Sequence, residues 1–155
     1  MVLPLSADPA FSRLLFDSHA RFVGVPLCPR RWPSDDKAAA WLYEQAPFAL
    51  LAHDTASDPL FIYANRAAQR CFEYSWEEFV GIPSRLSAEP GAPREERDAL
   101  IRSVAERHYA TGYRGVRISK SGRRFWIEDG TVWNLVDACG VLHGQAAVVR
   151  TWSDA

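Results

Sequence analysis

The stretch FIYANRAAQRCFEYSWEEFVG, residues 61–81, changes from strand-like to helix-like sequence at a single asparagine. Aromatic and β-branched residues precede Asn65, and small residues that favour a helix follow it. Asn65 therefore suits the N-cap of a short helix, and Ser75, followed by two glutamates, predicts the N-cap of a second helix that ends at Gly81. A fold for this chain must place two short helices directly after a strand.

The sequence on either side of this stretch predicts the other elements. Residues 48–54 and 60–64 form two strands of a hairpin, joined by a turn rich in Ser, Asp and Pro. After an irregular connector, the clearest helix begins near Pro93, has Arg107 and His108 in its last turn and ends before Gly112. Three further strands are predicted at 113–119, 125–136 and 141–152.

Two helices are predicted before the first strand. One spans residues 8–23, and the other begins at the N-cap Ser34 and ends before Pro47, with a proline-rich linker between them. We therefore expect an α+β fold, with a five-stranded antiparallel sheet, helices inserted after the second strand and two extra N-terminal helices. We divide the chain into an N-terminal helical extension, residues 1–47, and a sheet domain, residues 48–155. A cavity is expected between the sheet and the inserted helices.

The composition of the chain indicates which kinds of partner it can bind and in which cellular compartment it is expected. The 155 residues are 48% hydrophobic with a net charge of −1, so one domain with a substantial core is expected, and the scattered basic residues indicate neither nucleic-acid nor membrane binding. No segment is apolar enough to span a membrane, and the N-terminus does not resemble a signal peptide. Cys28, Cys71 and Cys139 are odd in number and form no CxxC, which argues against disulfides and zinc and favours the cytoplasm.

Several strings in this order resemble a known family. YANRAA, SWEEF, PSRLSAEP, GVRIS, SGRRF, TVWNL and HGQAA, spread over about residues 48–152, resemble PAS domains and, more closely, the bacterial MEKHLA-domain proteins, a PAS-related group. The resemblance extends to the helices at 11–46. It implies a PAS-like sensory or regulatory module that detects a small molecule or a partner. Since no effector region is left over in the 155 residues, we expect signalling through a separate effector protein or a homodimer.

The resemblance also permits a test for flavin. Light-sensing flavin domains of the PAS class carry a string like GxNCRFLQ, whose cysteine forms the photoadduct, and this chain has GIPSRLS with Ser84 at that position. At the positions of the two asparagines and the glutamine that hold the flavin ring, this chain has Arg117, Ile127 and, near the last position, Val149. A serine cannot replace the thiol, and the two aliphatic side chains cannot hydrogen-bond the ring. We therefore expect no covalent flavin adduct.

Histidine positions bear on haem and metal binding. A haem requires an axial ligand, and His108 lies where a PAS-type haem ligand is found. Alternatively, His108 is a favourable charge at the C-terminus of its helix. His19, His53 and His143 are isolated and show no metal-binding spacing. We expect neither haem nor a metal site, and the identity of any ligand stays open.

A small ligand without a metal remains as the favoured interpretation. Arg85 and Arg117 are candidates for clamping a carboxylate or phosphate at the cavity mouth; alternatively, they form surface ion pairs with glutamates. Gln145 lies among small residues and offers a polar contact. The predicted ligand-binding set is Arg85, Arg117, Ile127, Trp133, Gln145 and Val149.

Two alternatives to ligand sensing stay open. Trp126 and Trp133 fall on opposite faces of their strand by simple alternation, unless a bulge at 128–130 resets it, and we expect one in the core and the other on the outer face as a partner surface. This favours a protein-interaction or dimerisation module with a filled core. The other alternative is a small enzyme that uses Tyr63, Glu128, Asp129 and His143 as acids and bases. Since no catalytic motif is present, we expect that the protein is not an enzyme.

Overall fold

The computed structural model describes residues 4–88 and 94–155, with the backbone alone for residues 94–97. The predicted start of the long helix, at Pro93, lies outside the described residues. The main elements, in chain order, are α1 (Pro9–Val23), α2 (Asp35–Glu44), β1 (Ala49–His53), β2 (Phe61–Ala64), α3 (Arg66–Phe72), α4 (Trp76–Phe79), α5 (Arg94–Arg107), β3 (Tyr109–Ile118), β4 (Arg124–Val136), β5 (Leu142–Val149) and β6 (Thr151–Asp154). Short 3₁₀ turns lie at Leu5–Ala7 and Ser84–Ser87.

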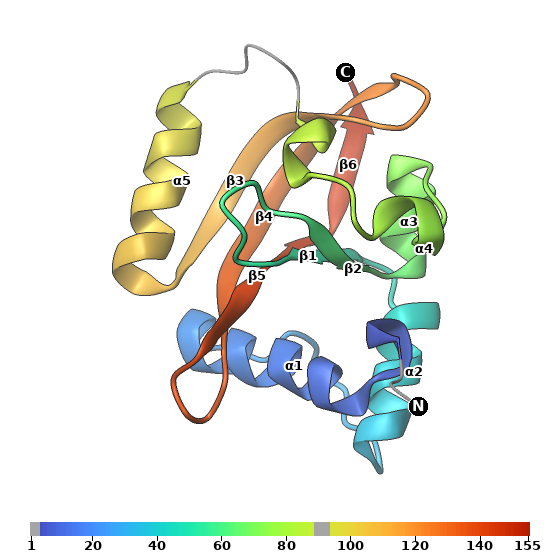
Figure 1. The fold of residues 1–155 in the computed structure, drawn as a ribbon, viewed down its shortest axis with the longest axis vertical. Helices are drawn as coiled ribbons and strands as arrows, with labels where there is room; N and C mark the ends of the chain where they lie inside the picture. The colour runs from blue at the N-terminus through green and yellow to red at the C-terminus, as the bar shows by residue number, and fades with distance from the viewer. Residues whose placement is uncertain (1–3, 89–93) are drawn as a thin grey trace.

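The strands form one antiparallel sheet in the order β2-β1-β5-β4-β3 (Figure 1). The sheet has six strands instead of the predicted five, because the last predicted strand divides at Arg150 into β5 and β6. Both pieces pair with β4 in one unbroken register, with Val148 opposite Thr131 and Thr151 opposite Glu128. Of these two pieces, only β5 also pairs with β1, so β6 continues alone beside β4.

Helices cover both faces of the sheet, which confirms the predicted α+β architecture. α1 and α2 pack on one face, here called the α1 face, over Leu50, Trp133 and Val148. α3 and α4 pack on the opposite face, here called the α3 face, over residues that include Ile127 and Val149. In Figure 1, α5 lies beside β3, away from α3 and α4. The division at residue 47 stays a prediction, although the helices before it share a core with the sheet.

The two predicted helix caps are confirmed. The Asn65 side chain accepts a hydrogen bond from the Ala68 N–H at the start of α3. Ser75 and Glu78 form a reciprocal capping box at α4. These caps satisfy backbone N–H groups that have no partner within the helix, so each helix begins at a defined residue.

The bulge at 128–130, the alternative to simple alternation, is present, so Trp126 and Trp133 do not lie on opposite faces of β4 as simple alternation predicts. Ile127 packs on the α3 face, whereas Trp133, an even number of residues later, packs on the α1 face, so the alternation shifts between them. Asp129 adopts a left-handed backbone conformation with a φ of 52° at this point. Trp126 consequently shares the α1 face with Trp133, but only Trp133 is completely buried beneath α1, whereas Trp126 is half-buried.

The end of the long helix differs from its prediction. α5 ends at Arg107, well before Gly112, and β3 begins at Tyr109. His108 makes the turn between them with a left-handed φ of 68°, and its N–H donates to the Val104 carbonyl at 2.9 Å. Gly112, with a φ of 70°, lies inside β3 where the pairing with β4 is irregular. None of the helices in the described residues is long and apolar enough to cross a membrane.

Candidate ligand site

The space between the sheet and the α3–α4 pair is filled by aromatic side chains. Phe61, Phe72, Phe79 and Phe125 are each at most 2% exposed. Their rings pack edge to face, with centroids 4.9 Å apart for Phe61 and Phe79 and 5.1 Å apart for Phe72 and Phe125. This part of the α3 face is therefore a solid core.

Two cavities lie beside α5. One cavity of about 380 Å³ lies between α5 and β3, and its lining includes Arg107 and Arg114. A second cavity of about 230 Å³, here called the α5 groove, lies between α5 and the β4–β5 pair. The α5 groove is lined by Leu100, Ile101, Val104 and Ala105 from the helix and by Asn134, Leu142 and Gln145 from the strands.

Two carboxamides form the polar part of the α5 groove. Asn134 and Gln145 are direct partners across β4 and β5, and their strand neighbours Trp133 and Ala146 point to the α1 face. Both amides therefore lie on the α3 face, below α5. Asn134 is 9% exposed, whereas the Gln145 side chain is half-buried and makes no hydrogen bond to any described residue.

Asn134 connects the groove to the N-terminal helix through His108. The Nδ2 group of Asn134 donates to Nδ1 of His108 across 3.2 Å, and the Asn134 N–H donates to the His108 carbonyl at 2.9 Å. The other side of the His108 ring stacks on Phe22 of α1, with centroids 4.4 Å apart and planes 21° apart. His108 thus contacts the groove and α1 at the same time.

Two further contacts hold α1 against the sheet. The Ser18 hydroxyl donates to the Val136 carbonyl and accepts from the Val136 N–H, both at 3.1 Å. His19 is buried, and the edge of its ring meets Trp133 with centroids 4.8 Å apart. Burial lowers the pKa of His19, so this ring stays neutral in the core. The side of α1 that faces the sheet is therefore held against β4 by direct contacts of Ser18 and His19.

The predicted ligand-binding residues are not all brought together. Gln145 lines the α5 groove, as a ligand-binding residue must. Ile127 and Val149 lie in the phenylalanine-filled core. Trp133 lies on the opposite face of the sheet, beneath α1, and does not share a space with Gln145. Of these four residues, Gln145 alone faces one of the two cavities beside α5.

The two arginines of the predicted anion clamp lie outside both cavities. Arg85 donates from Nε to both carboxylate oxygens of Asp58, at 3.2 and 3.3 Å, which matches the alternative of a surface ion pair. Its predicted partners were glutamates rather than Asp58. The Arg117 guanidinium lies over the Tyr113 ring, 5.4 Å from the centroid. An anion clamp built on this pair stays a prediction.

Three of the four residues considered for catalysis have other contacts or are buried. His143 hydrogen-bonds Asp137 at 2.8 Å, and Glu128 accepts from Arg114 at 3.2 Å. Tyr63 is buried on the α1 face, and burial raises the pKa of its hydroxyl. None of the hydrogen bonds among the described residues joins any two of these catalytic candidates.

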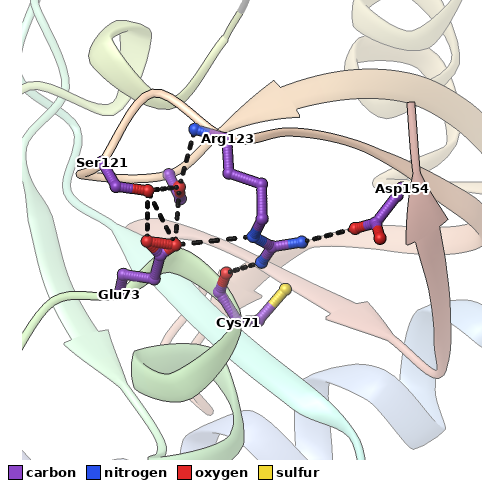
Figure 2. Close-up of polar contacts among 6 residues, drawn as sticks. Cys71, Glu73, Ser121, Arg123 and Asp154 are labelled. Carbon is purple, nitrogen blue, oxygen red and sulfur yellow. Dashed lines mark hydrogen bonds and ion pairs between the residues drawn. The ribbon is translucent and has the colours of Figure 1, made fainter.

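A polar cluster that the sequence analysis missed lies at the end of α3 (Figure 2). Glu73 has a left-handed φ of 64° and accepts hydrogen bonds from Ser119, Ser121 and Arg123. The hydrogen bonds from Ser121 and Ser119, followed by Arg123, lower the pKa of this carboxyl. Glu73 therefore ties α3 to the turn between β3 and β4.

The same arginine extends this cluster to the last strand. The Arg123 guanidinium donates to the Cys71 carbonyl at 2.7 Å and to Asp154 of β6 at 3.0 Å (Figure 2). The Cys71 thiol is buried, and burial raises its pKa to about 12, so it is not a reactive thiolate. We interpret the cluster as structural. Its sequence signal, an acidic residue after a helix and a distant SxSxR string, is too common to be distinctive.

The family model of the MEKHLA domain matches residues 9–154. The chain belongs to the MEKHLA family. The match includes α1 and α2, so the MEKHLA domain of this chain contains the helices on the α1 face together with the sheet. None of the curated proteins matches the chain in sequence.

Solved structures show what the MEKHLA fold is similar to. A PAS domain of a protein from Colwellia psychrerythraea has a TM-score of 0.63 and 20% identity over 77% of this chain and 95% of its own. An RNA-binding light-oxygen-voltage receptor has a TM-score of 0.63 and 22% identity over 84% of this chain and 37% of its own. The light-oxygen-voltage domain of Aureochrome1, a blue-light photoreceptor, has a TM-score of 0.56 and 18% identity over 69% of this chain and 75% of its own. These likenesses show a PAS-type fold.

The residues of this MEKHLA domain do not fit a flavin in the arrangement described. A buried flavin ring between α3–α4 and the sheet would have to displace the four phenylalanine rings of the core. Ile127 and Val149 are buried there and offer the ring edge no hydrogen bond. His108, the haem-ligand candidate, stacks on Phe22 and does not belong to that core.

Proposed function

We propose that this protein is a sensory module in which a small molecule binds in the α5 groove and changes how α1 is held against the sheet. Membership of the MEKHLA family and the PAS-type fold support a sensory role. The observation that carries the proposal is the chain of contacts from Asn134 to His108 to Phe22, which joins the groove to α1.

Competition for the Asn134 amide is the step that couples ligand to helix. In the free protein, Nδ2 of Asn134 lies 3.2 Å from Nδ1 of His108. A ligand that accepts a hydrogen bond from this amide draws the amide away from His108. His108 then loses one of the contacts that orient its ring on Phe22. A ligand shifts a conformational equilibrium only by its differential affinity for two states, and this exchange of hydrogen bonds supplies the difference.

The output in this proposal is a protein–protein contact of α1. α1 is a surface helix of 15 residues, and its exposed side is available to a separate effector protein or to a second copy of the chain. When α1 loosens, that surface changes its position relative to the sheet. A cytoplasmic setting suits such a module, since all three cysteines are free.

A covalent tag in the groove tests the coupling without knowledge of the natural ligand. Ala105 lines the groove and is exposed, so Ala105→Cys can be tagged with a benzyl methanethiosulfonate in a background with Cys28→Ser and Cys139→Ser. The matched control carries the same tag at Ala40→Cys on the exposed side of α2. The readout is hydrogen–deuterium exchange of the α1 amides.

We expect the groove tag to raise exchange in the C-terminal half of α1 about fivefold, because losing about 1 kcal/mol of local contact changes the open population by that factor. The control tag should leave α1 unchanged. If α1 exchanges identically with both tags, the groove is not coupled to α1 and the proposal is wrong.

One observation favours a second candidate, an interaction module without a ligand. Trp126 lies half-buried on the α1 face, with the Arg114 guanidinium 3.8 Å from its ring centroid. Neither residue is among those that pack under α1 or α2. Such a partly exposed aromatic is typical of a protein contact. In this case Trp126→Ala should convert a dimer to a monomer by light scattering, and the groove tag should have no effect on α1.

A further inference from the structure

The lining of the α5 groove defines what kind of molecule it can take. Seven described residues line it, and none of these seven carries a charge. The cavity on the other side of α5 differs, because its lining includes Arg107 and Arg114. An ion buried without a counter-charge loses its hydration at a large cost, so the groove selects against carboxylates, phosphates and ammonium groups. A ligand of this groove is therefore neutral.

The hydrogen-bonding groups of the groove form a matched pair. Asn134 and Gln145 lie opposite each other in the β4–β5 ladder, and each amide offers one C=O acceptor and one NH₂ donor group. The Gln145 side chain makes no hydrogen bond to any described residue, and the Asn134 side chain bonds only His108 among the described residues. Two adjacent amides with this free capacity are complementary to a ligand that carries a donor and an acceptor side by side.

The remaining walls are apolar and partly uncovered. Val104 is buried at the base, whereas Ile101 is 54% exposed and Leu142 is 48% exposed at the rim. Large aliphatic side chains at a rim gain by covering a non-polar part of a ligand. The volume of about 230 Å³ lies below that of pockets for drug-sized molecules, which begin near 300 Å³.

We infer that the α5 groove binds a small neutral molecule with a carboxamide-type group and a compact apolar remainder, the carboxamide facing Asn134 and Gln145. This inference rests on the proposed function, of which it names the ligand class. It commits to a small molecule rather than a protein segment, because the space is too small for several residues of an extended chain.

Three isosteric probes test the ligand class. Benzamide carries the donor and the acceptor, benzoate replaces them with a charge, and acetophenone keeps only the acceptor. Each is titrated into ¹⁵N-labelled full-length protein, and the side-chain NH₂ signals of Asn134 and Gln145 are followed by NMR. For a fragment of this size we expect a dissociation constant on the order of 1 mM for benzamide. Acetophenone should bind about tenfold more weakly, since it has no N–H and leaves an amide carbonyl acceptor of the groove unpaired, and benzoate should bind more weakly still.

Matched variants locate the binding. Gln145→Leu keeps the size of the side chain and removes its amide, and should weaken benzamide about tenfold. Gln45→Leu is the control, because Gln45 is an exposed glutamine at the end of α2 and lies outside the groove. The benzamide affinity of this control should not change. A far-ultraviolet circular dichroism spectrum for each variant shows that it is folded.

Three outcomes would overturn the ligand class. The first is that benzoate binds as tightly as benzamide. The second is that the two amide signals do not shift at saturating benzamide. The third is that the groove signals depend on protein concentration without any probe, which indicates that a second copy of the chain occupies the groove. Each outcome is distinguishable from failure of the proposed function. The tag on Ala105 reports coupling to α1 whatever the chemistry of the natural ligand.

Discussion

Asn65 is completely buried, and its side chain makes four hydrogen bonds that join three elements. Oδ1 accepts from the N–H groups of Leu50 and Ala68, both at 3.0 Å. Nδ2 donates to the carbonyls of Leu42, at 3.1 Å, and Phe48, at 3.0 Å. One side chain thus holds the end of α2, the start of β1 and the first turn of α3, and the substitution Asn65→Ala removes all four bonds.

The expected loss follows from these contacts. Two buried N–H groups lose their partner at about 1–3 kcal/mol each, and the two carbonyls add less because each has a second lone pair. We expect the free energy of unfolding to fall by about 4 kcal/mol. For a chain of 155 residues this lowers the urea midpoint by about 2 M and the melting temperature by roughly 8–16 °C.

Two comparisons separate this role from ordinary helix capping. Asn65→Ser keeps an oxygen that can cap Ala68 but is too short to bond the other partners, so it should lose most of the 4 kcal/mol. Ser75→Ala removes the cap of α4, an exposed hydrogen bond, and should cost about 1 kcal/mol. The assay is urea unfolding followed by circular dichroism and tryptophan fluorescence. If Asn65→Ala costs no more than Ser75→Ala, Asn65 is only a cap and the reasoning is wrong.

Three further predictions concern other parts of the fold. Gly144→Ala should prevent stable folding, because the new Cβ would lie 2.0 Å from the His53 carbonyl oxygen; an unchanged melting temperature contradicts this. The lowered pKa of Glu73 means that its carboxylate stabilises the folded state above its unfolded pKa, and that this contribution is lost as the pH falls from about 5 through the folded pKa. Glu73→Gln should therefore flatten the acid side of the stability profile, whereas a profile parallel to wild type refutes the role of Glu73. A thiol reagent should modify the exposed Cys139 quickly, whereas it should modify the buried Cys71, whose pKa is raised to about 12, only when the protein unfolds. Mass spectrometry follows the labelling, and equal labelling rates for the two cysteines would contradict this prediction.

The elements that the sequence predicts well are those with short-range signals. Asn65 and Ser75 cap helices whose first N–H groups lie within three residues, so the cap and its partners are read together from the sequence. The bulge near Asp129 is one of two alternatives that the sequence leaves open, because the spacing of Trp126 and Trp133 is compatible with either. For each cap the physical cause lies within a few neighbouring positions.

The features that the sequence does not predict depend on contacts between distant segments. α5 ends at Arg107, and His108 makes the turn after it in a left-handed conformation, although it is not glycine, because Phe22 and Asn134 hold its ring there. Neither residue is near His108 in the sequence. Asn134 was missed as a groove residue for a different reason. Asn134 is placed on the same face as Gln145 only when the shift at Asp129 and the pairing of β4 with β5 are both known.

The α5 groove lies between the sheet and an inserted helix, as predicted, but the sequence does not show which part of that space is filled, since four separate elements fill the part under α3 and α4. Phe61, Phe72, Phe79 and Phe125 come from β2, α3, α4 and β4. Each is an ordinary core residue in its own segment. Only their convergence shows that the space under α3 and α4 is closed and that the open space lies beside α5.

The helices on the α3 face are therefore held with different strength. α3 and α4 are fixed by the Asn65 hydrogen bonds, the phenylalanine core and the Glu73 cluster. α5 has a cavity on either side and exposes Ile101, and Val104 is its one fully buried side chain among those described. Local opening is easiest where few apolar contacts are lost, so a response to a ligand should begin at α5. His108 directly follows α5, and its ring stacks on Phe22 of α1. A displacement of α5 should therefore first change the stacking of His108 on Phe22.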